Sequence, residues 1–288
     1  MKKIFVLFFV IFFPLSGFAE QIKVFVSVLP QKYFVEKIGK DTVLAEVMVL
    51  PGHSPASYNP KPQQMKRLSD ADIYFSIDVP FEKTWLPKIR ENYKNLYVSD
   101  CTQKILKRKT DENFFEDNGH DHDGHDHGFY DPHVWMSPLN ALKISRNIMM
   151  VLSQKNPSKK DFYLENYLSF SKEILELDLN LLKSTQNIKN KNVFVFHPSW
   201  GYFMDDYNLK QIPVESQGKE PGPKYLAKLM EFAKKNNIKT LLVQPQFPLS
   251  TAKVMEKTLG LNVVTADPLA EDWKNNLIKT AEIIVEKN

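Results

Sequence analysis

Short apolar runs alternate with amphipathic segments along most of the chain, and this alternation predicts its fold. The runs are rich in branched and aromatic residues, which favour strands, and the segments between them have helical spacing. The predicted strands lie at 24–28, 45–50, 73–77, 96–98, 193–196, 211–214, 240–243 and 262–265. The predicted helices beside them lie at 30–38, 61–69, 81–93, 223–236, 250–259 and 271–286. Strands that alternate with helices predict two α/β halves built on parallel sheets.

A long helical pattern separates the two halves. A helix is expected at 138–154, and after a break at Asn156-Pro157 a second one at 158–187. Its apolar residues recur every three, four or seven positions and form one stripe: Leu164, Leu168, Leu175, Leu179 and Leu182. About 30 residues at 1.5 Å each would extend roughly 45 Å, enough for a stiff connector. We therefore predict an α/β protein with two parallel-sheet lobes, at 20–137 and 190–288, joined across 138–189 by one long rigid helix.

The first 19 residues have the pattern of a secretory signal peptide. A basic start, Met1-Lys2-Lys3, precedes an apolar run at 4–15, and Ser16-Gly17-Phe18-Ala19 offers small residues for cleavage after Ala19. The run is shorter than the roughly 20 residues that a transmembrane helix needs. We expect residues 1–19 to be removed and the mature protein to be soluble in the periplasm.

Composition and charge exclude several classes of protein. The chain is 43% hydrophobic and 25% charged, which is typical of globular domains. Its 38 Lys and Arg residues against 34 Asp and Glu give a formal charge of only +4, too small and scattered to indicate nucleic-acid binding. The single cysteine, Cys101, excludes a disulfide framework and a Cys-rich zinc module. Seven histidines remain as candidate metal ligands.

Four of the seven histidines crowd into one acidic, glycine-containing loop at about 117–128. They alternate with carboxylates: His120, His122, His125 and His127. Such a segment can bind transition metals weakly and at several stoichiometries. We interpret it as an accessory site for metal capture; the alternative is a solvated spacer with incidental metal affinity.

The other three histidines and one aspartate follow strands or precede the connector. His53 follows the second strand, His197 the first strand of the second half and Asp267 the last strand, whereas His133 lies just before the connector. In parallel sheets, ligands bind beyond the carboxyl ends of strands, so these side chains could face one cleft between the lobes. Three imidazoles and a carboxylate suit tetrahedral Zn²⁺. Taken alone, a histidine after a strand is more often a cap or a hydrogen-bonded surface group than a metal ligand.

The motifs around these residues resemble a known family. The run Asp131-Pro132-His133-Val134-Trp135, a long helix, His197 and then Asp267-Pro268-Leu269 is similar to the zinc- and manganese-specific solute-binding proteins of ABC transporters. The resemblance covers essentially the whole mature chain. It implies one metal in a cleft between two lobes and delivery to a permease in the inner membrane. It also implies that His133, His197 and Asp267 are the second, third and fourth ligands, and a His-rich loop is typical of zinc-specific members.

The chain departs from the family pattern in two places. The family's first ligand is usually the histidine of Pro-His-x-Tyr, but here Ala56 occupies that position and His53 lies three residues earlier. We predict that His53 substitutes; the alternative is a site of three protein ligands and water. A glutamate common in a later segment is replaced by Gln244, which favours zinc over manganese and predicts that Gln244 supports a ligand from behind.

Other polar and aromatic residues near these positions have plainer interpretations. Trp135 is expected to pack beside His133 and to support it from behind. Glu215 and Glu220 are expected in a solvated loop rather than as oxygen ligands. The basic run Lys104, Lys107, Arg108 and Lys109 is expected to be a solvated face.

The sequence thus predicts a monomeric periplasmic receptor that captures Zn²⁺ and delivers it to an ABC permease. Three alternatives remain open: a manganese receptor of the same family, an adhesin of the same fold, and a hydrolase whose zinc is held by three histidines. The hydrolase would need an open coordination position and a general base. The sequence has no His-Glu-x-x-His helix and no Gly-x-Ser-x-Gly turn, and Asp267 would close the open position. We therefore expect no enzymatic activity.

Overall fold

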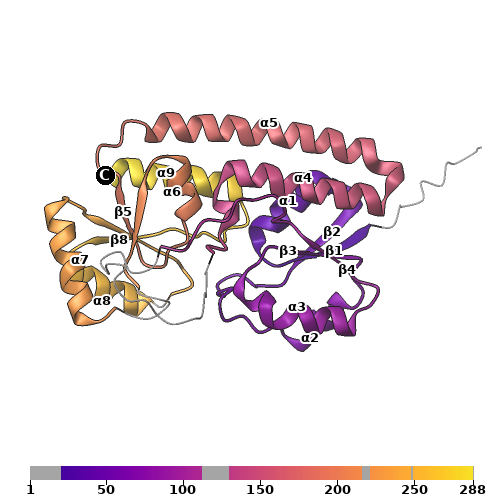
Figure 1. Cartoon of the computed structure of the whole chain (residues 1–288), viewed down its shortest axis with the longest axis horizontal. Helices are drawn as coiled ribbons and strands as arrows, with labels where there is room; N and C mark the ends of the chain where they lie inside the picture. Colours follow the sequence, from indigo (N-terminus) through magenta and orange to yellow (C-terminus); the bar gives the residue numbers. More distant parts are fainter. Residues whose placement is uncertain (1–20, 112–129, 216–220, 248, 288) are drawn as a thin grey trace, which may run out of the picture.

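Two four-stranded parallel sheets form two lobes, and helices cover both of them (Figure 1). The computed structural model describes residues 21–111, 130–215, 221–247 and 249–287. The strand orders are β2-β1-β3-β4 in the first sheet and β6-β5-β7-β8 in the second. Each lobe therefore winds outward in both directions from its first strand. The predicted α/β class with two parallel-sheet lobes is confirmed.

The N-terminal lobe is built on strands of four or five residues that alternate with helices. Register pairs such as Val24 with Ala45 and Val24 with Ile73 place β1 in the middle of the sheet. The four strands are β1 (Ile22–Val26), β2 (Val43–Val47), β3 (Ile73–Ser76) and β4 (Tyr97–Asp100). The helices are α1 (Leu29–Gly39), α2 (Pro62–Leu68) and α3 (Pro80–Asn92), with a short 3₁₀ turn, η1 (Lys40–Thr42).

The C-terminal lobe repeats this pattern, and its central strand has two buried faces. Val193 and Val195 of β5 join a core shared with the N-terminal lobe, whereas Phe194 belongs to a separate core under α7 and α8. This division follows from the alternation of side chains along a strand. The strands are β5 (Asn192–Val195), β6 (Lys210–Pro213), β7 (Thr240–Val243) and β8 (Asn262–Thr265). The helices are α6 (Gly201–Asp206), α7 (Pro223–Lys235), α8 (Leu249–Leu259) and α9 (Trp273–Lys287).

Two helices connect the lobes. After the 3₁₀ turn η2 (Val134–Met136), α4 (Pro138–Lys155) begins with Ser137 as its cap, whose hydroxyl accepts from the Asn140 backbone amide. The 3₁₀ turn η3 (Pro157–Lys159) then leads into α5 (Lys160–Thr185). The 26 residues of α5 extend about 39 Å and lie across both lobes (Figure 1). The predicted long connecting helix is confirmed.

An aromatic cluster joins the lobes into one core. Trp273, at the start of α9, packs edge-on against Phe34 of α1 with ring centroids 5.0 Å apart, and it also contacts Phe170 of α5. Its indole N–H donates to the Trp135 carbonyl at 2.6 Å. The last helix of the chain therefore packs against the first lobe, so the two lobes share a hydrophobic core.

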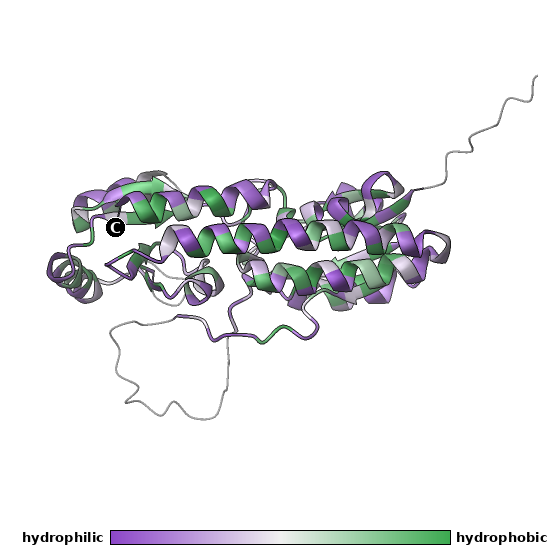
Figure 2. Ribbon diagram, turned by 90° about the horizontal axis from the view of Figure 1, so that it is seen from above, coloured by the Kyte–Doolittle hydropathy of each residue, from purple (hydrophilic) through white to green (hydrophobic). Residues whose placement is uncertain are grey.

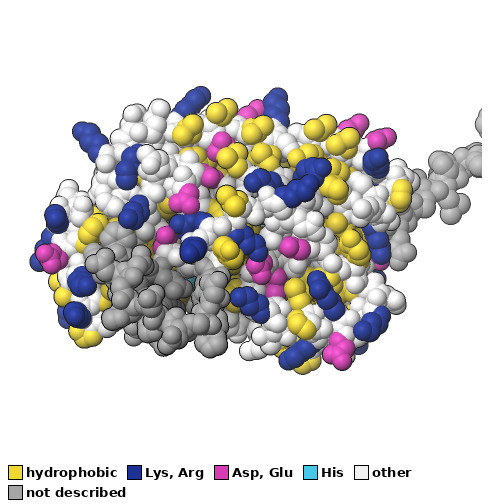
Figure 3. Space-filling model, in the orientation of Figure 1, with side chains coloured by type: hydrophobic (Ala, Val, Ile, Leu, Met, Phe, Trp, Pro, Cys, Tyr) yellow, Lys and Arg dark blue, Asp and Glu magenta, His cyan; other side chains and the backbone are white. Residues whose placement is uncertain are grey.

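The leucine stripe of α5 is not the face that packs against the lobes. The buried side chains of this helix are Tyr163, Phe170, Ile174, Leu177, Leu181 and Thr185. The five leucines of the stripe are 39–58% exposed. Apolar stretches run along α5 when the molecule is seen from above (Figure 2), and hydrophobic and charged side chains gather along this upper edge (Figure 3). These six residues, which include the two leucines Leu177 and Leu181, lie on another side of the helix and form its packing face.

The other sequence predictions have clear outcomes. All eight strands and the helices of both lobes lie within a few residues of their expected positions, and only the short α6 was not predicted. Cys101 is fully buried. In the described ranges, no helix is both long and apolar enough to cross a membrane. The expected signal peptide, residues 1–19, lies outside the described residues.

A buried carboxyl in the N-terminal lobe should make stability depend on pH. Glu82 accepts hydrogen bonds from the backbone amides of Ile77 at 2.9 Å and Asp78 at 2.8 Å. Burial raises the pKa of Glu82 from 4.5 to about 7, although hydrogen bonds from Ser27 and these two amides lower it. The folded state thus favours the protonated carboxyl, so stability falls as the pH rises from about 4.5 to 7.

We predict that Glu82→Gln removes this pH dependence. Relative to the variant, the wild type should lose about 3 kcal/mol of unfolding free energy between pH 4.5 and 7, as urea denaturation would measure. Glu91→Gln, at an exposed position of the same helix, is the control and should follow the wild type. Parallel pH profiles for wild type and Glu82→Gln would contradict the assignment.

Candidate metal centre

His133 is oriented by the aspartate two residues before it. Asp131 Oδ1 accepts hydrogen bonds from the backbone N–H of His133 at 2.9 Å and from its Nδ1 at 2.7 Å. Because the carboxylate accepts, Nδ1 carries the proton and Nε2 keeps a free lone pair. Carboxylate–histidine pairs of this kind fix the ring of a metal-binding histidine and raise its basicity.

The carboxylate of Asp131 is fully buried and needs compensation. Its second oxygen accepts from the Arg108 guanidinium at 3.0 Å, and its backbone carbonyl accepts from the Tyr202 hydroxyl at 2.9 Å. Burial alone would raise the pKa of Asp131, but hydrogen bonds from His133 and the charge of Arg108 hold it below its ordinary value. Asp131 therefore stays ionised and keeps its hold on His133.

The expectation that the basic run is a solvated face is wrong for Arg108. Only 17% of its side chain is exposed, and besides Asp131 it binds Asp111 at 3.0 Å and Asp205 at 2.7 Å. Burial would lower the pKa of Arg108, but the three carboxylates outweigh it and raise the pKa. Arg108 thereby ties the segment after β4 to α6 of the other lobe. The sequence offered no signal for this role, because two of the three aspartates, Asp131 and Asp205, lie far from Arg108 along the chain.

His197 is held in a similar way, by a glutamate from the neighbouring strand. It follows β5, and its Nδ1 is hydrogen-bonded to Oε1 of Glu215, just beyond β6. The expectation of a solvated loop is wrong for Glu215, which is 6% exposed. Parallel pairing of β5 with β6 brings the C-terminal ends of these two strands together. The position of Glu215 just after a strand was therefore the sequence signal that could have indicated its contact with His197. Glu220 lies outside the described residues.

Gln244 fixes the backbone at His197. Its amide nitrogen donates to the His197 carbonyl at 2.7 Å and to the Ser199 hydroxyl at 3.0 Å. Its amide oxygen accepts from the His197 backbone N–H at 3.4 Å. Both ends of the Gln244 amide are thus engaged behind the histidine rather than turned toward a ligand.

The structure brings His133 and His197 together across the lobes. Their ring centroids lie 5.4 Å apart with the planes at 73°. An ion bonded to one nitrogen of each ring at about 2.0–2.1 Å, with a tetrahedral angle between the bonds, would place the centroids about 5 Å apart. The spacing therefore fits two imidazoles that share one metal ion.

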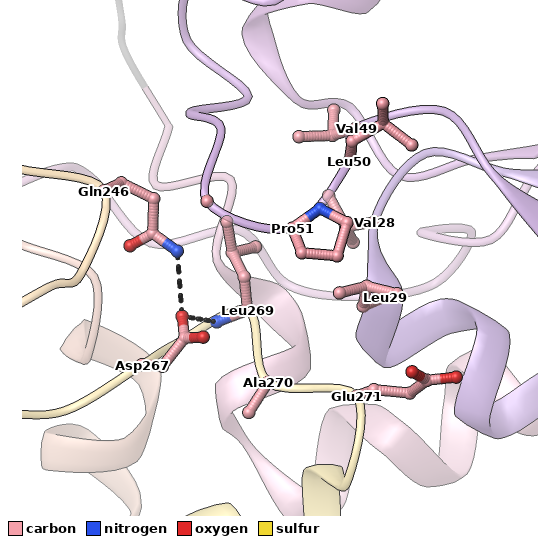
Figure 4. Close-up of a pocket in the computed structure, with 11 residues that line it drawn as sticks. Val28, Leu29, Val49, Leu50, Pro51, Gln246, Asp267, Leu269, Ala270 and Glu271 are labelled. Atoms are coloured by element: carbon pink, nitrogen blue, oxygen red, sulfur yellow. Dashed lines mark hydrogen bonds between the residues drawn. The ribbon is translucent and has the colours of Figure 1, made fainter. Parts of the chain in front are cut away.

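Asp267 lies at the edge of a cavity between the lobes. The cavity has a volume of about 260 Å³, with Pro51 on one side and Asp267 and Gln246 on the other (Figure 4), and Gly52 also lines it. Asp267 Oδ1 accepts from the Gln246 side-chain amide and from the Leu269 backbone N–H, both at 2.9 Å. The aspartate is therefore anchored by one oxygen only.

One short loop connects Asp267 to the histidine pair. Gln246 of this loop donates to Asp267, and the ring of Phe247, the next residue, lies 6.0 Å from that of His197. Trp135, whose ring lies 5.4 Å from His133, donates its indole N–H to the Pro268 carbonyl at 2.7 Å. The three predicted ligands thus share their immediate neighbours.

His53 is exposed and turned toward its own loop. Its Nδ1 lies 3.1 Å from the Pro51 carbonyl, and its ring packs edge-on against Tyr58 with centroids 5.6 Å apart. No contact between His53 and the other predicted ligands is present. Across the described ranges, no three His, Cys, Asp or Glu side chains are grouped closely enough to hold one ion.

The two ends of the His-rich loop meet beside His133. Lys109 and Tyr130 form an isolated antiparallel bridge, and the Asp131 backbone N–H donates to the Arg108 carbonyl at 3.0 Å. His120, His122, His125 and His127 lie outside the described residues. The segment that carries them thus begins and ends next to the aspartate that orients His133.

Comparison with known proteins matches almost the whole chain to one family. The family model described as zinc-uptake complex component A, periplasmic (ZnuA), matches residues 24–286. The zinc-binding lipoprotein AdcA of Streptococcus pneumoniae is 28% identical over 244 residues, which are 83% of this chain and 48% of AdcA. The high-affinity zinc uptake system protein ZnuA of Bacillus subtilis is 26% identical over 246 residues, 84% of this chain and 76% of that protein. The chain thus spans about half the length of the streptococcal relatives.

Solved structures agree with this match. A crystal structure of a ZnuA deletion mutant with zinc bound superposes with a TM-score of 0.84 and 34% identity, covering 93% of this chain and 98% of that one. The laminin-binding protein Lmb of Streptococcus agalactiae superposes with a TM-score of 0.79 at 21% identity, covering 93% of this chain and 99% of that one. The likeness to Lmb shows a shared fold.

We predict that Gly201→Ala disrupts the Arg108–Asp131 pair. A Cβ at this position would collide with the Arg108 guanidinium and lie 2.5 Å from Asp131 Oδ2. Overpacking of this kind should lower the unfolding free energy by about 1–3 kcal/mol in urea denaturation. Gly222→Ala is the matched control, because a Cβ there meets no atom within 4 Å, and it should leave stability nearly unchanged. Equal stability of the two variants would contradict the tight packing at Gly201.

Proposed function

The chain belongs to the ZnuA family of periplasmic zinc-uptake components, and on this premise we propose that it captures Zn²⁺ between its lobes and delivers it to an ABC permease. The observation that carries the proposal is the pairing of His133 with His197 at a ring separation of 5.4 Å. A buried carboxylate orients each of the two rings. Two preoriented imidazoles from different lobes make a site that captures an ion as it enters the cleft.

We propose that His133, His197, Asp267 and His53 together bind the ion. Asp267 and the Pro51-Gly52 segment next to His53 line the same cavity. Asp267 has an oxygen without a protein hydrogen bond among the described residues, and His53 makes only weak contacts within its own loop. A small movement of these two loops would complete the site around the histidine pair. The alternative set has three protein ligands and one water.

The donor set favours zinc over manganese. Glu215 is hydrogen-bonded through Oε1 to His197 Nδ1, and both ends of the Gln244 amide are engaged, so we assign neither residue as an oxygen ligand. The remaining donors are imidazole nitrogens and a single carboxylate, which suit Zn²⁺, whereas Mn²⁺ prefers more oxygen ligands. Glu215 and Gln244 support His197 from behind.

The same donor set argues for binding rather than catalysis. A hydrolytic zinc site keeps one coordination position open for water and places a general base beside it. Here a fourth protein ligand would fill that position, and the carboxylates closest to the histidines are engaged with their Nδ1 atoms. We therefore propose a carrier without enzymatic activity, located in the periplasm and served by a permease in the inner membrane.

We propose that His120, His122, His125 and His127 collect zinc close to the tight site. Their sequence pattern suits weak binding of several ions. The bridge between Lys109 and Tyr130 brings both ends of this segment beside Asp131, which is hydrogen-bonded to His133. Zinc held there would be concentrated at the cleft.

We predict that His133→Ala and His197→Ala each lower zinc affinity more than about 100-fold, because each removes a preoriented ligand. Calorimetric titration in protein lacking residues 117–128 isolates the tight site. His53→Ala in the same background distinguishes the two ligand sets: a comparable loss supports four protein ligands, and unchanged affinity supports three ligands and water. Unchanged tight binding in both His133→Ala and His197→Ala would refute the site.

We predict that deleting residues 117–128 lowers the zinc stoichiometry and leaves one tight site. The reason is that the four loop histidines are not among the proposed ligands of the tight site. Atomic absorption after dialysis would give the stoichiometry, and competition with a chelator would give the affinity. Loss of the tight site, or a stoichiometry of one in the full chain, would contradict accessory capture.

A further inference from the structure

The exposed stripe of α5 is a surface that the zinc site does not explain. Its five leucines lie within about 60° of one another around the helix and cover about 27 Å of its length. Single exposed leucines are ordinary on protein surfaces. Here five leucines on one face of a helix are each 39–58% exposed. A continuous row of five on one straight helix has the form of a helix-pairing seam.

Charged residues along one flank of the stripe alternate in sign. Glu165, Lys172, Glu176 and Lys183 follow one another on the same side of the leucines, and all four are exposed. Lys172 and Glu176, with side chains 81% and 61% exposed, form an i,i+4 pair at 4.0 Å. From the N-terminal to the C-terminal end of the helix the charges are therefore negative, positive, negative, positive. Read from the C-terminal end, they are positive, negative, positive, negative.

We propose that this face binds a second copy of the chain, with the two α5 helices antiparallel. A two-fold axis near residue 174 would place Leu175 against Leu175 of the second copy and Leu168 near Leu182. The same axis would place Glu165 opposite Lys183 and Lys172 opposite Glu176. In antiparallel helix pairs each flank faces the same flank of the partner, so apolar and charged contacts agree on one register.

The charge order selects this partner over others. A parallel pair would turn this flank toward the opposite flank of the partner helix, so the four charges would lose these favourable contacts. A partner surface with charges of only one sign would repel two of these four residues. Only a surface with the reversed order satisfies all four charges, and the chain itself carries that order.

The dimer should be weak and dependent on concentration. One helix pair of about 27 Å is narrow, and stable interfaces bury roughly 1,200–2,000 Å² in total. The sequence alone favours a monomer. The exposure of the leucine stripe is the observation that favours a weak dimer instead. The pairing would leave the predicted ligands free, since α5 runs along one edge of the molecule, above both sheets (Figure 1). It does not depend on the proposed zinc function.

Charge reversal tests the antiparallel register. In sedimentation velocity at rising protein concentration, the wild type should shift from monomer toward dimer. Glu165→Lys and Lys183→Glu should each weaken association about tenfold, because each creates two like-charge contacts. The double variant should recover wild-type association, because it restores opposite charges. A wild type that stays monomeric throughout, or a double variant as weak as the single ones, would overturn the proposal.

Thiol crosslinking tests the two-fold axis directly. Cys101 is fully buried, so an introduced surface cysteine is the reactive one. With a short bis-maleimide, Leu175→Cys should crosslink to itself and Leu164→Cys should not, because the two copies of residue 164 would lie about 30 Å apart along the axis. A mixture of Leu164→Cys and Leu182→Cys should crosslink. Self-crosslinking of Leu164→Cys would show another arrangement and refute this one.

Discussion

A buried negative charge organises the centre of this molecule. The carboxylate of Asp131 has no exposed surface, and an unpaired charge in that position would cost several kcal/mol. Asp131 pairs with Arg108 and is hydrogen-bonded to His133. Because Arg108 also binds Asp205 in the other lobe, the segments that carry Arg108, Asp131 and Asp205 are held together. Glycine at position 201 leaves the space that this arrangement needs. The orientation of a candidate metal ligand and the joining of the lobes therefore depend on the same charge pair.

The fold could be predicted from the sequence almost completely, because its signals are local. Each strand is a short apolar run, each helix has its own periodicity, and parallel pairing follows from their alternation. The face that α5 buries could not be predicted. Its five exposed leucines form the clearest periodic stripe, yet Phe170 and Ile174 on another side of the helix pack against the lobes. Periodicity identifies a helix, and only tertiary packing selects its buried face.

The candidate site could be predicted in part. His133 and His197 carry motif and strand-end signals, and the structure brings their rings together. Their carboxylate partners differ in how visible they are. Asp131 stands two residues before His133 and could be suspected, whereas Glu215 meets His197 only through the pairing of two strands. Whether His53 and Asp267 join the site is a question about loop positions, which spacing along a chain does not determine.

The aromatic cluster around Trp273 affects how long a bound ion would stay. This residue belongs to the last helix yet packs against Phe34 in the first lobe, and its indole N–H reaches the backbone of Trp135 beside His133. Wide separation of the lobes would expose this cluster to water, at a cost of several kcal/mol for the large rings involved. Release of an ion bound as proposed would therefore depend on movement of the ligand loops and not on wide separation of the lobes.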